Sequence, residues 1–129
     1  MMSDKRLCAC DGHTLDRLLQ PTVMAVLSKG PLHGYALVDC LKDSPLMKGA
    51  KPDPTGVYRL LAVLEEQGLV SHDWGESKLG PSKRMYKLTG AGSDCLSRWI
   101  DALDGYQRDV SRLVAEMREG VVQKPQANE

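Results

Sequence analysis

Residues 52–69, PDPTGVYRLLAVLEEQGL, decide the fold because they predict a short amphipathic helix with a marked beginning and end. Asp53 can cap the helix N-terminus, and Pro54 suits the first helical position, where no N–H partner is needed. Gly68 suits the left-handed residue that follows a helix C-terminus. Apolar residues recur at helical spacing and predict a face that packs into a core, namely Val57, Leu60, Leu61 and Leu64.

A second face of the same helix carries polar groups. Thr55, Tyr58, Arg59 and Ala62 are three or four residues apart, and the face begins at the helix N-terminus. A hydroxyl, a phenol and a guanidinium can contact base edges and phosphates in a DNA major groove. Taken alone, the segment also fits an ordinary surface helix. The neighbouring segments are therefore needed to distinguish a DNA-reading helix from a surface helix.

The neighbouring segments predict a winged helix-turn-helix domain. Upstream, VMAVLSKGPLHGYALVDCL (residues 23–41) indicates two helices, at 15–28 and 33–42, joined by a turn. Pro21 either kinks the first helix or marks a later start. Downstream, LVSHDWGESKLGPSKRMYKLT (residues 69–89) indicates a basic β-hairpin with strands at 69–74 and 84–88. We therefore expect a mainly α fold with a small β-hairpin.

Several short motifs make the chain resemble the PadR family of transcriptional regulators. They are GPLHGY (residues 30–35), Pro54 with Val57-Tyr58, LEEQGLV (64–70), and RMYKLT (84–89) with Gly92. The resemblance extends from about Leu18 through the last helix. It implies a sequence-specific, effector-responsive repressor, and some family members respond to phenolic or other aromatic compounds. The family often has Gly-Ser or Gly-Thr before Val-Tyr and Pro after it. Thr55-Gly56 and Arg59 stand there instead, so base preference is not carried over.

The last predicted helix, from about Ala91 to Glu119 with Thr89 as its cap, carries an apolar heptad repeat. Such a stripe is too long for one winged-helix domain to cover, so we expect it to pack against a partner chain in a homodimer. The alternative is that the helix folds back on its own domain. The stripe alternates gaps of three and four residues: Leu96, Trp99, Leu103, Tyr106, Val110, Leu113 and Met117.

The predicted organisation has four parts. Residues 1–14 form a flexible N-terminal segment and residues 15–89 a winged helix-turn-helix DNA-binding domain. Residues 90–119 form a C-terminal dimerisation helix, and residues 120–129 a disordered tail.

A dimer of this kind would place two recognition helices in successive major grooves about 34 Å apart, on an inverted-repeat operator. Arg59 is the best candidate for guanine, because its fork matches O6 and N7 together, unless it is only a solvated charge. Tyr35 could donate to a phosphate while its ring packs inward. We assign His33 no chemical role, as a loop histidine or helix cap. The candidate contacts to double-stranded DNA are Lys51, Thr55, Tyr58, Arg59, Tyr35, Lys78, Lys83 and Arg84.

Composition bounds the function. The chain has 17 basic and 17 acidic residues. This balance by itself is mild evidence against binding to nucleic acid. That balance supports a rival function, a winged-helix protein–protein interaction module. The basic residues of the hairpin are nevertheless clustered, and they would hold phosphates, enter the minor groove, or only solubilise the tip.

Other classes are disfavoured. No nucleophile–base pair, phosphate loop or carboxylate pair suggests an enzyme, and no apolar run approaches the roughly 20 residues that span a bilayer. Without a signal peptide, a cytoplasmic protein is expected.

Two features could receive a signal. Trp99, on the heptad stripe, could stack against a small aromatic effector, or it is simply part of the dimer core. No cofactor is expected, but Cys8, Cys10 and His13 could bind zinc, copper(I) or an iron–sulfur cluster. The two thiols could instead form a redox sensor or be ordinary cysteines.

Overall fold

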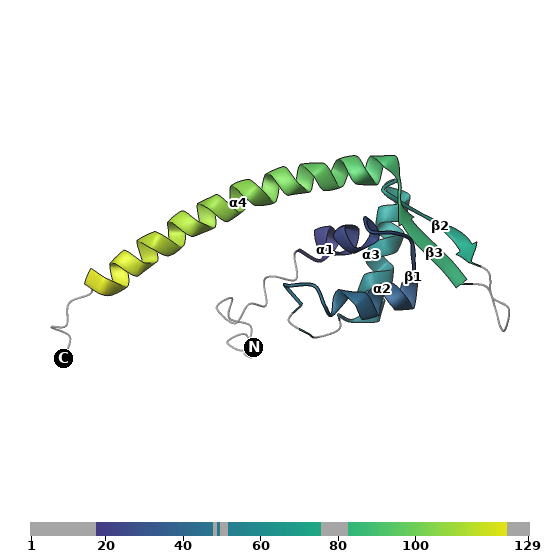
Figure 1. Cartoon of the computed structure of the whole chain (residues 1–129), viewed down its shortest axis with the longest axis horizontal. Coiled ribbons are helices and arrows are strands. Elements are labelled where there is room, and N and C mark those ends of the chain that lie inside the picture. Colours follow the sequence, from purple (N-terminus) through teal and green to yellow (C-terminus); the bar gives the residue numbers. More distant parts are fainter. Residues whose placement is uncertain (1–17, 48, 50–51, 76–82, 124–129) are drawn as a thin grey trace, which may run out of the picture. The chain divides into compact units, whose positions relative to one another are not determined.

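A computed structural model describes residues 18–47, 49, 52–75 and 83–123 of the chain. Within these ranges the chain forms a mainly α winged helix-turn-helix fold, as expected (Figure 1). It divides into two compact units, with the boundary between Leu96 and Ser97 inside the last helix. The elements in chain order are α1 (Leu19–Leu27), β1 (Leu32–His33), α2 (Gly34–Leu41), α3 (Pro54–Glu66), β2 (Val70–Gly75), β3 (Lys83–Leu88) and α4 (Gly90–Gln123).

Helix α3 begins and ends where its local signals predict. The Asp53 carboxylate accepts a hydrogen bond from the Thr55 N–H at 3.4 Å, and Pro54 occupies the first turn. Gly68 follows the helix with φ +79°, a conformation that glycine adopts without strain. Three residues of the predicted apolar face, Val57, Leu61 and Leu64, are fully buried, whereas Leu60 is half-buried at its edge.

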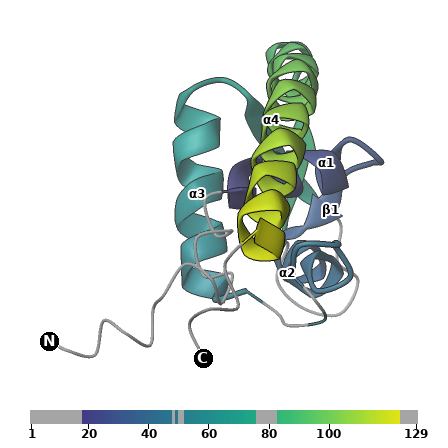
Figure 2. The ribbon, with the colours of Figure 1, turned by 90° about the vertical axis from the view of Figure 1, so that its left-hand side faces the viewer.

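Helices α1 and α2 pack with α3 around one core. Helix α1 begins at Leu19, and Pro21 lies in its first turn, where its missing N–H is not needed. Residues 15–17 of the predicted helix lie outside the described residues. Figures 1 and 2 show α2 crossing α3 steeply, as the two helices of a helix-turn-helix do. The buried core residues are Val23, Met24, Leu27, Leu37, Val38, Leu41, Val57, Leu61, Leu64, Val70 and Tyr86.

The sheet has one strand more than the predicted hairpin. Its strand order is β1-β3-β2, and both pairings are antiparallel. The additional strand β1 contains only Leu32 and His33, which pair with Tyr86 and Met85. A strand of two residues is too short to show an alternating polar and apolar pattern in the sequence. Its extended conformation is stabilised by pairing with β3. It brings the turn before α2 against the wing.

Helix α4 is capped as predicted but is longer than predicted. Thr89 Oγ1 accepts from the Gly92 N–H at 3.0 Å and donates to the Gly68 carbonyl at 2.6 Å. The helix ends at Gln123, so the expected boundary at Glu119 is wrong and residues 120–123 are helical, not part of a tail. Gly120 disfavours helix by about 1 kcal/mol relative to alanine, too little to stop an established helix from propagating.

From Tyr106 onward, α4 presents the predicted apolar stripe to solvent, whereas Trp99 and Leu103 are half-buried. Tyr106, Val110, Leu113 and Met117 are 38–62% exposed. The next position of the stripe is Gly120, which carries no side chain, and Val121 beside it is 72% exposed. No helix within the described part of the chain is both long and apolar enough to cross a membrane.

Candidate nucleic-acid interface

The outer face of α3 exposes the predicted Arg59. Its side chain has no ion-pair or hydrogen-bond partner among residues 18–47, 49, 52–75 and 83–123, and Thr55 is exposed one turn earlier. Because Val57 and Leu61 anchor the opposite face in the core, α3 holds this guanidinium outward. A guanidinium without an internal partner keeps all its donors for an external acceptor.

Tyr58 takes a different direction from Arg59. Its ring lies against Gly34, the first residue of α2, and is 42% exposed. A Cβ atom at Gly34 would lie 2.7 Å from Tyr58 Oη and 2.9 Å from Cζ, so only glycine leaves room for the phenol. The predicted polar face of α3 is therefore divided, with Arg59 pointing outward and Tyr58 leaning toward α2.

Tyr35 and His33 form a cluster with Lys83 of the wing. The His33 and Tyr35 rings are stacked, with centroids 6.2 Å apart and planes 4° from parallel. Lys83 Nζ lies 4.4 Å from the centroid of the Tyr35 ring, a cation–π contact. Tyr35 is 59% exposed, so the expectation that its ring packs inward is wrong. The sequence suggested no role for His33. It belongs to the cluster because β1 pairs with β3 and places it beside the wing.

Arg84 is another exposed cation of the wing. Its Cζ lies 5.6 Å from the ring of Trp74, which is 62% exposed. Hydrogen bonding to Tyr86 raises the pKa of Arg84 above its ordinary value. The guanidinium is charged at neutral pH even without this shift. Lys87, in contrast, pairs with Asp73 at 3.5 Å. Lys51 and Lys78, also predicted to contact DNA, lie outside the described residues.

One polar contact ties the wing to α3. His72 Nδ1 of β2 contacts the Glu65 carboxylate, and both side chains are about a quarter to a third exposed. The His72 ring also lies 5.8 Å from the rings of Trp74 and Tyr86. This contact fixes the Glu65 carboxylate between α3 and β2.

These side chains line a hollow of about 310 Å³. It is bordered by the end of β1, by β3, and by the N-terminal parts of α2 and α3. The hollow combines an ammonium, a guanidinium and phenol hydroxyls, and no carboxylate among the described residues lines it. Such a set of donors suits an anion. The lining residues are His33, Gly34, Tyr35, Tyr58, Lys83, Arg84 and Tyr86.

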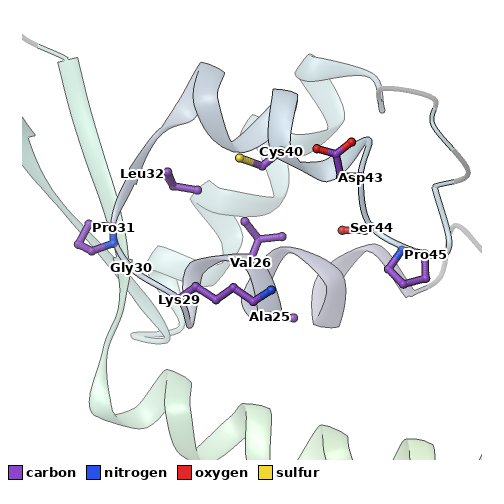
Figure 3. A pocket seen from close by; sticks show the side chains of 10 residues that line it. All are labelled: Ala25, Val26, Lys29, Gly30, Pro31, Leu32, Cys40, Asp43, Ser44 and Pro45. Carbon is purple, nitrogen blue, oxygen red and sulfur yellow. The ribbon is translucent and has the colours of Figure 1, made fainter.

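A second hollow, of about 520 Å³, lies between α1 and α2 (Figure 3). Its walls are mainly apolar, with Val26 and Leu32 among them, and it also contains the Cys40 thiol. Lys29 and Asp43 give its rim opposite charges, so charge alone selects neither an anion nor a cation.

The described residues hold no cluster of three or more potential metal ligands. The predicted metal ligands Cys8, Cys10 and His13 lie outside these residues. Cys40 is exposed and Cys95 half-buried, and both are free thiols.

Known proteins agree with this architecture. A family model described as the transcriptional regulator PadR-like family matches residues 23–98. No curated protein sequence matches the chain. A PadR-like transcription factor from Bacteroides fragilis is 25% identical over 81% of this chain and 97% of its own, with a TM-score of 0.66.

Two further structures are similar. A PadR family transcriptional regulator from Eggerthella lenta is 26% identical over 88% of this chain and 97% of its own, with a TM-score of 0.68. Bacillus subtilis PadR, crystallised in complex with operator DNA, is 26% identical over 65% of this chain and 46% of its own, with a TM-score of 0.58.

Proposed function

The chain belongs to the PadR-like family of transcriptional regulators, and from that premise we propose that it is an effector-responsive repressor. It would bind an inverted-repeat operator as a homodimer. The observation that carries this proposal is the exposed Arg59 of α3, which has no partner among the described residues and lies on the same domain as a cation-lined hollow. The similar Bacillus subtilis PadR, crystallised with operator DNA, supports it.

Helix α3 would enter the major groove. Arg59 would bind guanine O6 and N7, with Thr55 at a neighbouring base or phosphate. Lys83 and Arg84 would contact phosphates or the minor groove from the wing, together with Lys51 and Lys78. Base contacts would determine sequence preference, whereas phosphate contacts would set position and most of the affinity.

The homodimer would form through α4. The exposed stripe from Tyr106 to Met117 is the main support, because apolar side chains on a heptad repeat are stabilised by a facing helix. Two copies joined in this way would present two α3 helices to successive major grooves.

An effector would act by favouring one separation of the two recognition helices over another. Its effect on operator affinity can be no larger than its differential binding to the two states. Trp99 on the stripe is our candidate contact for a flat aromatic compound. In a Trp74→Phe background, Trp99 fluorescence should be quenched by a binding aromatic. A panel that produces no saturable quenching would remove Trp99 from this role.

No cofactor is required for the proposed DNA contacts. Cys8, Cys10 and His13 stay candidates for a metal site or a redox pair. Elemental analysis of protein purified without chelator or oxygen tests the metal: a stoichiometric metal would support the site, and a metal-free protein would oppose it.

The decisive experiment measures binding to duplex DNA from the upstream region of the protein's own gene, with a salt titration and a scrambled competitor. We expect affinity to fall with salt and to resist the competitor. Arg59→Ala should cost about 1–3 kcal/mol and relax preference at one base pair, whereas Lys83→Ala should weaken binding to all sequences alike. Wild-type affinity in both variants would contradict this contact map.

The rival is a protein–protein interaction module, supported by the balance of 17 basic and 17 acidic residues. It predicts weak binding that is equal for the upstream duplex and its scrambled version. Selection from randomised DNA separates the two functions, because only a sequence-specific regulator should enrich a consensus. Failure to enrich any motif would favour the protein-binding module.

A further inference from the structure

We propose that the hollow between β1, α2, α3 and β3 is a preformed site for one backbone phosphate of DNA, with Tyr58 as a phosphate ligand and not a base reader. The inference rests on the proposed function and deepens it. It gives His33 and Gly34, to which the sequence assigned no role, the task of positioning the ligands.

The chemistry of the lining selects a phosphate. A phosphodiester carries one negative charge and accepts hydrogen bonds through two oxygens. Lys83 supplies an ammonium, Arg84 a guanidinium fork, and Tyr35 and Tyr58 supply hydroxyl donors, all lining the same 310 Å³ hollow. The Glu65 carboxylate contacts His72 of β2 and is not among the residues that line the hollow. Donors therefore surround the hollow, and none of its lining residues in the described part of the chain is acidic.

The backbone adds to this preference. Helix α2 begins at Gly34, with His33 as its N-cap, and its N-terminus has no side-chain cap and no acidic residue in the first turn. The first N–H groups of a helix have no intrahelical acceptors, and the helix dipole favours an anion there. An anion in this hollow would therefore lie at an uncapped helix N-terminus, beside the two side-chain cations.

The ligands are held in place before DNA arrives. Tyr58 packs closely against Gly34 because glycine has no Cβ atom. A Cβ atom at Gly34 would lie 2.7 Å from the Tyr58 hydroxyl oxygen. Tyr35 is stacked on His33 and lies beneath Lys83. Groups already ordered lose less conformational entropy on binding, so each contact contributes more to affinity.

His33 is a positioning residue in this scheme. Its Nδ1 atom is buried and has no hydrogen-bond partner in the described part of the chain. Its ring is instead held by packing, against Tyr35 and against Gly75, where a Cβ atom would lie 2.7 Å from His33 Cε1. A larger residue at Gly75 would displace the imidazole and, through it, Tyr35.

The first test uses the full-length protein and inorganic phosphate without DNA. Amide chemical shifts of Gly34 and Tyr35 should change saturably, and Tyr58→Phe or Lys83→Gln should each weaken this binding about fivefold. Tyr58→Phe keeps the ring that packs on Gly34, so the fold is preserved. Lys87→Gln is the matched control, with the same loss of charge on the same strand but at a lysine paired with Asp73. Absent shifts, or an equal loss in the control, would overturn the site.

The second test uses operator duplexes with single methylphosphonate substitutions, which remove one phosphate charge at a time. One position per half-site should cost wild type about tenfold in affinity. In Tyr58→Phe and Lys83→Gln that position should lose its cost, whereas Arg59→Ala should retain it.

Two outcomes separate this inference from the proposed function. An undiminished methylphosphonate cost in the Tyr58 and Lys83 variants, despite specific DNA binding, would overturn the DNA-phosphate assignment alone. Phosphate-induced shifts in a protein that binds no specific DNA would contradict the proposed repressor and assign the hollow to a soluble phosphate compound.

Discussion

The winged-helix unit and the part of α4 beyond Ser97 satisfy their apolar residues in opposite ways. Every fully buried apolar side chain of the described residues lies before Leu96. Beyond Ser97, the large apolar side chains are half-buried or exposed, with Leu113 49% and Met117 56% exposed. The first unit thus has a hydrophobic core of its own, whereas the second presents an apolar helix face that has no covering partner among the described residues. The difference indicates that substitutions in the first unit act on folding, and those in the second act on association.

The largest expected effect is in the core of the first unit. Leu61 of α3 is fully buried, so Leu61→Ala should destabilise the unit by about 2–5 kcal/mol through lost burial and an unfilled cavity. Urea unfolding monitored by Trp74 fluorescence in a Trp99→Phe background measures this cost. Val63→Ala on the same helix, at a position 43% exposed, is the control and should stay within about 0.5 kcal/mol. Equal costs at both positions would contradict the assignment of the core face.

Features determined by near neighbours in sequence were predicted from the residues. Asp53, Pro54 and Gly68 act within one helical turn of the α3 ends, so their roles can be predicted without knowledge of the tertiary structure. The Thr89 cap of α4 is of the same kind. Each of these signals depends on backbone groups only a few residues away, and the structure confirmed each one.

Features determined by distant pairing were not predicted. Strand β1 exists because Leu32 and His33 pair with β3, more than fifty residues later. The place of Tyr58 depends on the missing side chain of Gly34, which helical periodicity within α3 cannot reveal. The candidate DNA contacts were thus identified by residue type, but their grouping into an outward arginine and a cation-lined hollow required the fold.

The next effect concerns association through the stripe of α4. Leu113→Glu should raise the dimer dissociation constant about 100-fold, equivalent to about 3 kcal/mol, because each chain loses a buried leucine and gains a charge at the seam. Sedimentation equilibrium measures the constant. Ser111→Glu, two residues away and off the stripe, is the control for adding a carboxylate to this helix. A dimer unaffected by Leu113→Glu would mean that α4 does not form the interface.

Two glycines of α4 sharpen the comparison, because the same substitution meets different surroundings. Gly92 is buried, and an added Cβ would collide with the Leu69 carbonyl oxygen and lie 3.1 Å from Leu88 Cδ2. Backbone cannot yield as a side-chain end can, so Gly92→Ala should destabilise the first unit by about 1–3 kcal/mol. Thermal unfolding of the unit, monitored by Trp74 fluorescence as above, measures it. An unchanged midpoint would mean that α4 begins without close contact to the segment after α3.

Gly105 should respond with the opposite sign. Among the described residues, an added Cβ there would meet only Arg108 Nη2, at an ordinary 3.8 Å, and the position lies two residues after Leu103 and off the heptad stripe. Alanine in a helix interior is favoured over glycine by about 0.8–1.0 kcal/mol, so Gly105→Ala should raise helix content and the midpoint of helix melting measured by circular dichroism. The gain should persist in the Leu113→Glu monomer, because it arises within one helix and not at the seam. Loss of stability in the dimer alone would show that the partner covers this face as well, which would make the interface wider than the stripe.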